Sequence, residues 1–167
     1  KAFLAILHIL KKANRLGPAL LQLPPAFSPR RLGDLASYLD RLPDEFPYAV
    51  EVRHHSFCDR GQHELALNGL LAEHHVDRVI MDTRPLFSDP PSDMSERQAQ
   101  SKKPRLPVHQ TITGSHPTIR LVGMNDVGHA SPWIREWAPI VAGWIYSGLT
   151  PYIFTHAPDE RYAPQLA

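Results

Sequence analysis

The most distinctive local pattern in the sequence is Glu51-Val-Arg53-His54, which places a carboxylate, a guanidinium and an imidazole within one short segment. Side chains alternate between the two faces of an extended segment, so Glu51 and Arg53 would share one face and the adjacent valines the other. If the valines face a layer of helices, the charged pair points to the opposite side of the sheet, where an unpaired charge is costly. The pattern therefore indicates either a structural ion pair or a pair of ligand-binding residues.

Other polar residues occur at or just beyond the ends of segments that we expect to be strands. In parallel α/β folds, ligands bind beyond the carboxyl ends of the strands, so these residues are candidates for one common site. The residue types suited to acid–base catalysis there are Glu51, Asp82 and His156. The candidate ligand-binding residues are Gln22, Arg53, His54, Arg120 and Asn125.

Two of these candidates, His54 and His156, raise the question of a metal site. With Glu51 and Asp82 they would supply nitrogen and oxygen ligands of the kind that barrel enzymes collect from several strands. However, the sequence has no His-x-x-x-His or Cys-x-x-Cys spacing, no glycine-rich dinucleotide or phosphate loop, and no Gly-x-Ser-x-Gly motif. We therefore assign no metal ligands, leave the cofactor unknown, and leave open whether the protein is an enzyme.

The elements that must position these residues follow from the apolar pattern and from the prolines. The 17 prolines predict short elements with firm ends. Apolar runs bounded by breakers predict strands, and apolar residues at helical spacing predict helices between them. The expected strands are 18–23, which should be fully buried, 48–53, 78–82, 118–122 and 151–155. The expected helices are a buried one over 2–10, one from Ser28 to Pro43, one over 61–75, and one that begins at Ser131.

Five strands alternating with helices predict a parallel α/β sheet with right-handed crossovers. At 167 residues the chain is long enough for a single domain, which we assign to residues 1–167. The pattern leaves two architectures open: an open doubly wound sheet, or the last five strands of a (β/α)8 barrel of the TIM type. The stretch 84–117 has no periodicity and is expected to form a long loop over the carboxyl ends of the strands.

The composition of the chain limits which binding partners and which cellular compartment we expect. The 18 Lys and Arg residues balance 17 Asp and Glu, which is too even for the broad positive field of non-specific nucleic-acid binding. The single cysteine, Cys58, cannot form an internal disulfide, and a cytoplasmic location is the simplest interpretation. The apolar start at 2–10 is too short to cross a bilayer, so we expect no membrane partner. The chain begins inside that expected helix without an initiator Met, which predicts a truncated N-terminus.

Five segments stand out together: 16–25 (LGPALLQLPP), 49–54 (AVEVRH), 103–107 (KPRLP), 151–156 (PYIFTH) and 163–167 (APQLA). With them the sequence resembles the YecE-like family, also called domain of unknown function seventy-two. The resemblance implies a (β/α)8-like barrel of which this chain carries the C-terminal part, strands four to eight. A departure is Phe57, where relatives often have Trp. The family has no assigned reaction, so the resemblance implies a fold and leaves the function open.

Three functional hypotheses follow from these observations. The leading one is an enzyme or a binding protein for a small polar or anionic ligand held by Arg53 and Arg120. The second is nucleic-acid processing, with an endonuclease-like, metal-assisted site beside the basic segment 102–105, and the even charge balance counts against it. The third is a non-catalytic interaction protein in which Glu51 and Arg53 only pair with each other.

Overall fold

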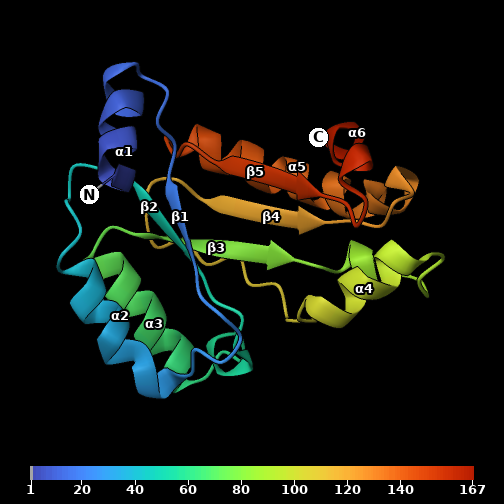
Figure 1. The fold of residues 1–167 in the computed structure, drawn as a ribbon, viewed down its shortest axis with the longest axis horizontal. Coiled ribbons are helices and arrows are strands. Elements are labelled where there is room, and N and C mark those ends of the chain that lie inside the picture. The colour runs from blue at the N-terminus through green and yellow to red at the C-terminus, as the bar shows by residue number, and fades with distance from the viewer. Residues whose placement is uncertain (1) are drawn as a thin grey trace.

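The computed structural model describes residues 2–167, which alternate between strands and helices along the chain (Figure 1). The strands are β1 (Ala19–Gln22), β2 (Tyr48–Glu51), β3 (Asp77–Asp82), β4 (Thr118–Val122) and β5 (Tyr152–His156). The helices are α1 (Ala2–Lys12), α2 (Leu32–Leu39), α3 (Gln62–Glu73), α4 (Met94–Lys102), α5 (Ser131–Tyr146) and α6 (Ala163–Leu166). Five short 3-10 turns connect these elements, at 29–31, 55–57, 85–87, 127–130 and 160–162.

All five strands are parallel, and their order in the sheet is their order in the chain. The sheet curls into a half-barrel, and α4 and α6 lie at the end toward which the arrowheads of β3, β4 and β5 point (Figure 1). A doubly wound sheet requires a point at which the strand order reverses, and residues 2–167 contain none. The strand order therefore favours the barrel type of winding over the doubly wound alternative.

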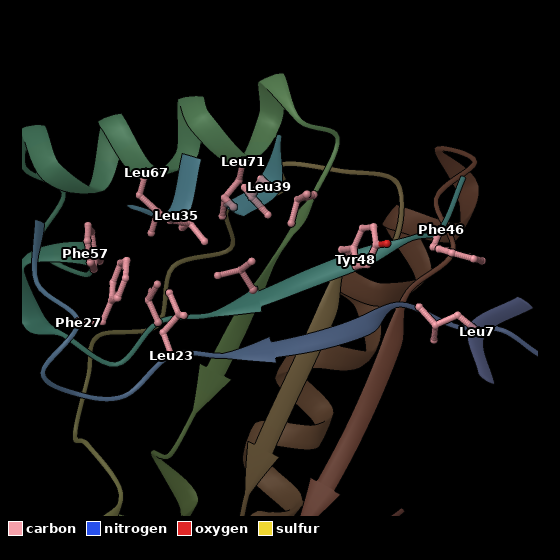
Figure 2. Packing of buried hydrophobic residues seen from close by; sticks show 13 residues of the cluster. Leu7, Leu23, Phe27, Leu35, Leu39, Phe46, Tyr48, Phe57, Leu67 and Leu71 are labelled. Atoms are coloured by element: carbon pink, nitrogen blue, oxygen red, sulfur yellow. The ribbon is translucent and has the colours of Figure 1, made fainter. Parts of the chain in front are cut away.

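The outer face of the sheet carries the main apolar core, where α2 and α3 cover β1 and β2. Val50 and Val52 point into this core, as the alternation along the strand predicts. Figure 2 shows leucines of both helices packed above β2. The labelled helix residues in that view are Leu35, Leu39, Leu67 and Leu71. Because the valines face the helices, Glu51 is left on the opposite, inner face of the sheet.

A second core lies between β4 and α5. Trp137 and Trp144 of α5 are buried against Ile119 and Leu121 of β4. The two indole rings are 6.0 Å apart between centroids. The helical spacing of the tryptophans therefore reflects core packing, and Arg120, which alternates with Ile119 and Leu121, is directed to the inner face.

Three expectations about the elements are wrong. Helix α1 is not buried, since Leu7 is its only buried residue and Ile9 is 67% exposed. Strand β1 is half-exposed rather than fully buried, because only β2 pairs with it among the described residues. The stretch 84–117 is not a structureless loop, because it contains α4, a helix without an apolar stripe.

None of the helices in residues 2–167 combines the length and the apolar character needed to cross a membrane.

The core between α2, α3 and β2 predicts unequal effects of two substitutions on one helix. Leu71 is completely buried, so Leu71→Ala should lower the free energy of unfolding by about 2–5 kcal/mol in denaturant titrations. Leu65 on the same helix is 67% exposed, and Leu65→Ala should change that free energy by less than about 0.5 kcal/mol. Equal losses in the two variants would contradict this packing.

Candidate functional site

The centre of the candidate site is the carboxylate of Glu51, the last residue of β2, which is fully buried. Arg53 donates from Nε to Glu51 Oε1 at 2.7 Å, and Arg120 donates from Nη1 to Oε2 at 2.8 Å. Each oxygen of the buried carboxylate thus has its own guanidinium. This double pairing offsets the desolvation of the charge, which would otherwise cost several kcal/mol.

Arg120 gathers residues from three strands at this point. It lies in β4, and its Nη1 also donates to Gln22 Oε1 at the end of β1, at 2.9 Å. Gln22 is the register partner of Glu51, so the two side chains end neighbouring strands side by side. The guanidiniums of Arg53 and Arg120 make no further hydrogen bonds within residues 2–167, and each guanidinium has five N–H groups. Both therefore keep free donors, and their side chains are 13% and 20% exposed.

Lys103 adds a third cation to this group from the end of α4. Burial lowers the pKa of its ammonium, and the positive charges of Arg120 and Arg53 lower it further, against the opposing effect of Glu51. In the described part of the chain this ammonium has neither a hydrogen bond nor an ion pair. A half-buried lysine beside two guanidiniums is unfavourable unless an anion joins them.

His156, the last residue of β5, lies beside these cations on the inner face of the sheet. It lies on the same face as Arg120, because Arg120 pairs with Phe154 and His156 is two residues further along β5. Burial lowers the pKa of the imidazole, and the charges of Lys103 and Arg120 lower it further. His156 is therefore neutral at pH 7 and able to accept a proton.

All of these side chains except that of Glu51 line one cavity of about 420 Å³ at the carboxyl ends of the strands. The α4 helix forms one wall, and the segment after β5 forms another. The cavity lining consists of Gln22, Arg53, Ser95, Gln98, Ala99, Lys102, Lys103, Arg120, His156, Pro158 and Glu160. Its size is within the range of small-molecule sites, roughly 300–1,000 Å³.

Helix α4 is attached to the sheet by polar contacts centred on Glu96, its only buried residue. One oxygen of Glu96 accepts from Ser92 N at 2.7 Å, and the other accepts from Asn125 N, just beyond β4, at 2.9 Å. The Asn125 side chain donates to Asp93 at 2.7 Å and accepts from Asp159 N at 2.8 Å. Asn125 thus joins α4 to the loops after β4 and β5. It does not line the cavity, so its contacts are those of a positioning residue.

Asp82 lies on the other face of the sheet, away from this cavity. Its Oδ2 accepts from Trp137 Nε1 at 2.8 Å and from Arg84 Nη2 at 2.7 Å. Arg84 in turn donates to both oxygens of Glu136 in α5 at 3.0 Å. Asp82 is fully buried, and these contacts attach β3 to α5. The structure therefore separates Asp82 from the other two residues that we expected to act as acids or bases.

His54 is also outside the cavity. Its Nδ1 accepts from Ser56 N at 3.3 Å and so caps the turn at 55–57, and its ring packs edge-on against Phe57. His54, His156, Glu51 and Asp82, the four side chains considered as metal ligands, are thus not brought together. Across residues 2–167, no three or more His, Cys, Asp or Glu side chains are grouped so as to hold a metal ion.

The ion pairs of Glu51 predict a large effect of removing its charge. Glu51→Gln leaves two guanidiniums facing a neutral amide, and should lower the free energy of unfolding by roughly 3 kcal/mol, measured by denaturant titration. Glu45→Gln is the matched control, because Glu45 forms an exposed pair with Lys11 at 3.2 Å and should contribute less than about 1 kcal/mol. A loss no larger than that of the control would show that the buried pairing contributes little to stability.

Comparison with known proteins identifies relatives over nearly the whole chain. The chain is 43% identical to UPF0759 protein YecE of Escherichia coli K12 and 42% identical to its counterpart in E. coli O157:H7. Each comparison spans 154 residues, which is 92% of this chain and 56% of the relative. The chain therefore spans little more than half the length of these curated relatives.

The fold agrees with a solved structure. A crystal structure of a DUF72 family protein (EF0366) from Enterococcus faecalis V583 superposes with a TM-score of 0.71 at 17% identity. The superposition covers 99% of this chain and 63% of the other. The sequence profile of the family described as "Protein of unknown function DUF72" matches residues 1–167. This chain therefore belongs to the DUF72 family.

Proposed function

We propose that the cavity at the strand ends binds a small anionic ligand. The observation that carries the proposal is the convergence of Arg53, Arg120 and Lys103 around one buried carboxylate, which leaves an excess of positive charge. Glu51 holds the two guanidiniums in place, and their remaining N–H groups are available to a ligand. Paired guanidiniums bind carboxylate and phosphate groups with defined geometry, because their donors lie in a rigid plane.

The same contacts assign roles to two of the expected acid–base residues. Both oxygens of Glu51 are occupied by arginines, so Glu51 is proposed to position the cations rather than to transfer protons. His156 is the residue of the site suited to proton transfer, since its imidazole is neutral and without a hydrogen bond within residues 2–167. An interaction protein in which Glu51 and Arg53 only pair with each other would not require the third cation, Lys103.

We also propose that the half-barrel is part of a closed (β/α)8 barrel in the longer proteins of the family. Two features support this. In the described chain β1 and β5 each pair on one side only. Apolar side chains on these strands are exposed, with Leu20 at 49% and Phe154 at 54%. Unpaired edges and exposed apolar side chains of this kind are normally covered in folded proteins.

Lys103→Gln tests anion binding, because Lys103 has no partner in the described chain whose loss would disturb the fold. We expect the affinity of this protein for sulfate, measured by isothermal titration calorimetry, to fall about tenfold. Stability without sulfate should be unchanged. Lys12→Gln removes the same charge from the exposed end of α1 and should leave sulfate affinity unaltered. Equal affinities in the wild type and Lys103→Gln, or no sulfate binding by the wild type, would refute the proposal.

The low pKa of His156 predicts a pH dependence of this affinity. In the empty site the imidazole is neutral at pH 7, and a bound anion favours its protonated form. Affinity for sulfate, which keeps its charge across this range, should therefore increase as the pH falls below the ordinary histidine pKa of about 6.5. His156→Asn should remove this increase and leave the affinity at pH 8 nearly unchanged. An equally steep increase in that variant would assign the pH dependence to another group.

A further inference from the structure

We propose that the ligand of this cavity is a phosphate monoester of a small polyhydroxyl compound, such as a sugar phosphate. This inference rests on the proposed anion site and specifies its substrate class. It is drawn from the charge around the cavity, the polarity of its walls and its volume.

The charge around the cavity suits a dianion. Four cations, Arg53, Lys102, Lys103 and Arg120, line it, against the carboxylates of Glu160 in the lining and Glu51 beneath. With His156 neutral, these groups leave two positive charges. A phosphate monoester carries nearly two negative charges at pH 7, since its second pKa is about 6. A single carboxylate would leave one of these charges unbalanced.

The arrangement of the donors also favours a phosphate group. The donors come from three directions: Arg53 follows β2, Arg120 lies in β4, and Lys103 follows α4. A phosphate presents three peripheral oxygens in a pyramid, whereas the two oxygens of a carboxylate share one plane. Three separated cations therefore match the phosphate oxygens more completely.

The lining residues other than the cations indicate the chemistry of the ligand beyond its phosphate group. Beyond the cations the lining is polar or small, and it includes Gln98, Glu160 and Ala99. The Gln98 and Glu160 side chains have no hydrogen-bond partner in the described chain, and both can bind hydroxyl groups. Among the described residues that line the cavity there is no Phe, Tyr or Trp, and the imidazole of His156 is the one aromatic ring on which a nucleobase could stack. At about 420 Å³ the cavity also has room for a body attached to the phosphate.

The alternative is a phosphate ester whose organic group is apolar. A groove of about 340 Å³ adjoins the same site and shares Arg120 and His156 with it. Leu20, Ala49 and Phe154 are among the residues that line this groove along the inner face of the sheet. However, that face is the one that a closed barrel fills with side chains. The polar cavity under α4 lies instead at the carboxyl ends of the strands, where ligands of such barrels bind.

The test compares probes by isothermal titration calorimetry on this protein. The probes are inorganic phosphate, ribose 5-phosphate, ribose and phenyl phosphate. We expect ribose 5-phosphate to bind at least about tenfold more tightly than inorganic phosphate and phenyl phosphate, and ribose not to bind measurably. If phosphate binds but ribose 5-phosphate is no tighter, the inference fails and the anion site stands. If phenyl phosphate is the tightest, the body is apolar and the inference is overturned. If none of the phosphates binds, both proposals fail.

Variants of the polar wall separate the body of the ligand from its phosphate. Gln98→Ala should weaken ribose 5-phosphate roughly fivefold to tenfold and leave inorganic phosphate within about twofold. Glu160→Gln also removes a negative charge from the lining, so it should tighten inorganic phosphate and lower the preference for ribose 5-phosphate over inorganic phosphate roughly fivefold to tenfold. Gln62→Ala, at the exposed start of α3, is the control and should change neither affinity. Equal losses for the two ligands in the Gln98 and Glu160 variants would contradict their assignment to the hydroxylated body.

Discussion

The buried carboxylate of Glu51 is the group on which the inner face of the sheet depends. It lies at the end of β2 and accepts from Arg53 on one oxygen and from Arg120 on the other. Through Arg120, which also binds Gln22, it connects the ends of β1 and β2 with the middle of β4, which neighbours neither strand in the sheet. A single negative charge thus holds two positive groups at a fixed separation. The positive character of the cavity is a consequence of this pairing, since each arginine uses only part of its donors on Glu51.

Much of this arrangement could be predicted from the sequence, because it follows from the period of two in a strand. The valines at 50 and 52 place Glu51 and Arg53 on the inner face, and the five parallel strands bring Gln22, Arg120 and His156 to the same end. The same rule explains why Asp82 lies apart from Glu51 and His156. Asp82 alternates in phase with Ile80, which packs toward α5, so it shares the outer face with the tryptophans. Its position at a strand end alone did not distinguish the two faces.

The pattern of apolar residues could not assign Lys103 to the site, because helix α4 has no apolar stripe that would predict it. Its sequence MSERQAQSK has only Met94 and Ala99 as apolar residues, and its only buried side chain is a glutamate. The available signal was local: Asp93 caps the helix, and its side chain accepts from Glu96 N at 2.8 Å, as in a capping box. That spacing of Asp93 and Glu96 predicts a helix start within the stretch 84–117. The docking of the helix through Asn125 is a tertiary contact that no spacing in the sequence encodes.

The polar attachment of α4 has a consequence for how this wall of the cavity responds to solvent. Elements held by apolar burial expose hydrophobic surface when they detach, and water opposes their release. The only buried side chain of α4 is that of Glu96, and the main leucine core contains no residue of this helix. The helix is joined to the loop after β4 by hydrogen bonds, for which water is a competing partner. The wall that carries Lys103 is therefore attached independently of the leucine core between α2, α3 and β2.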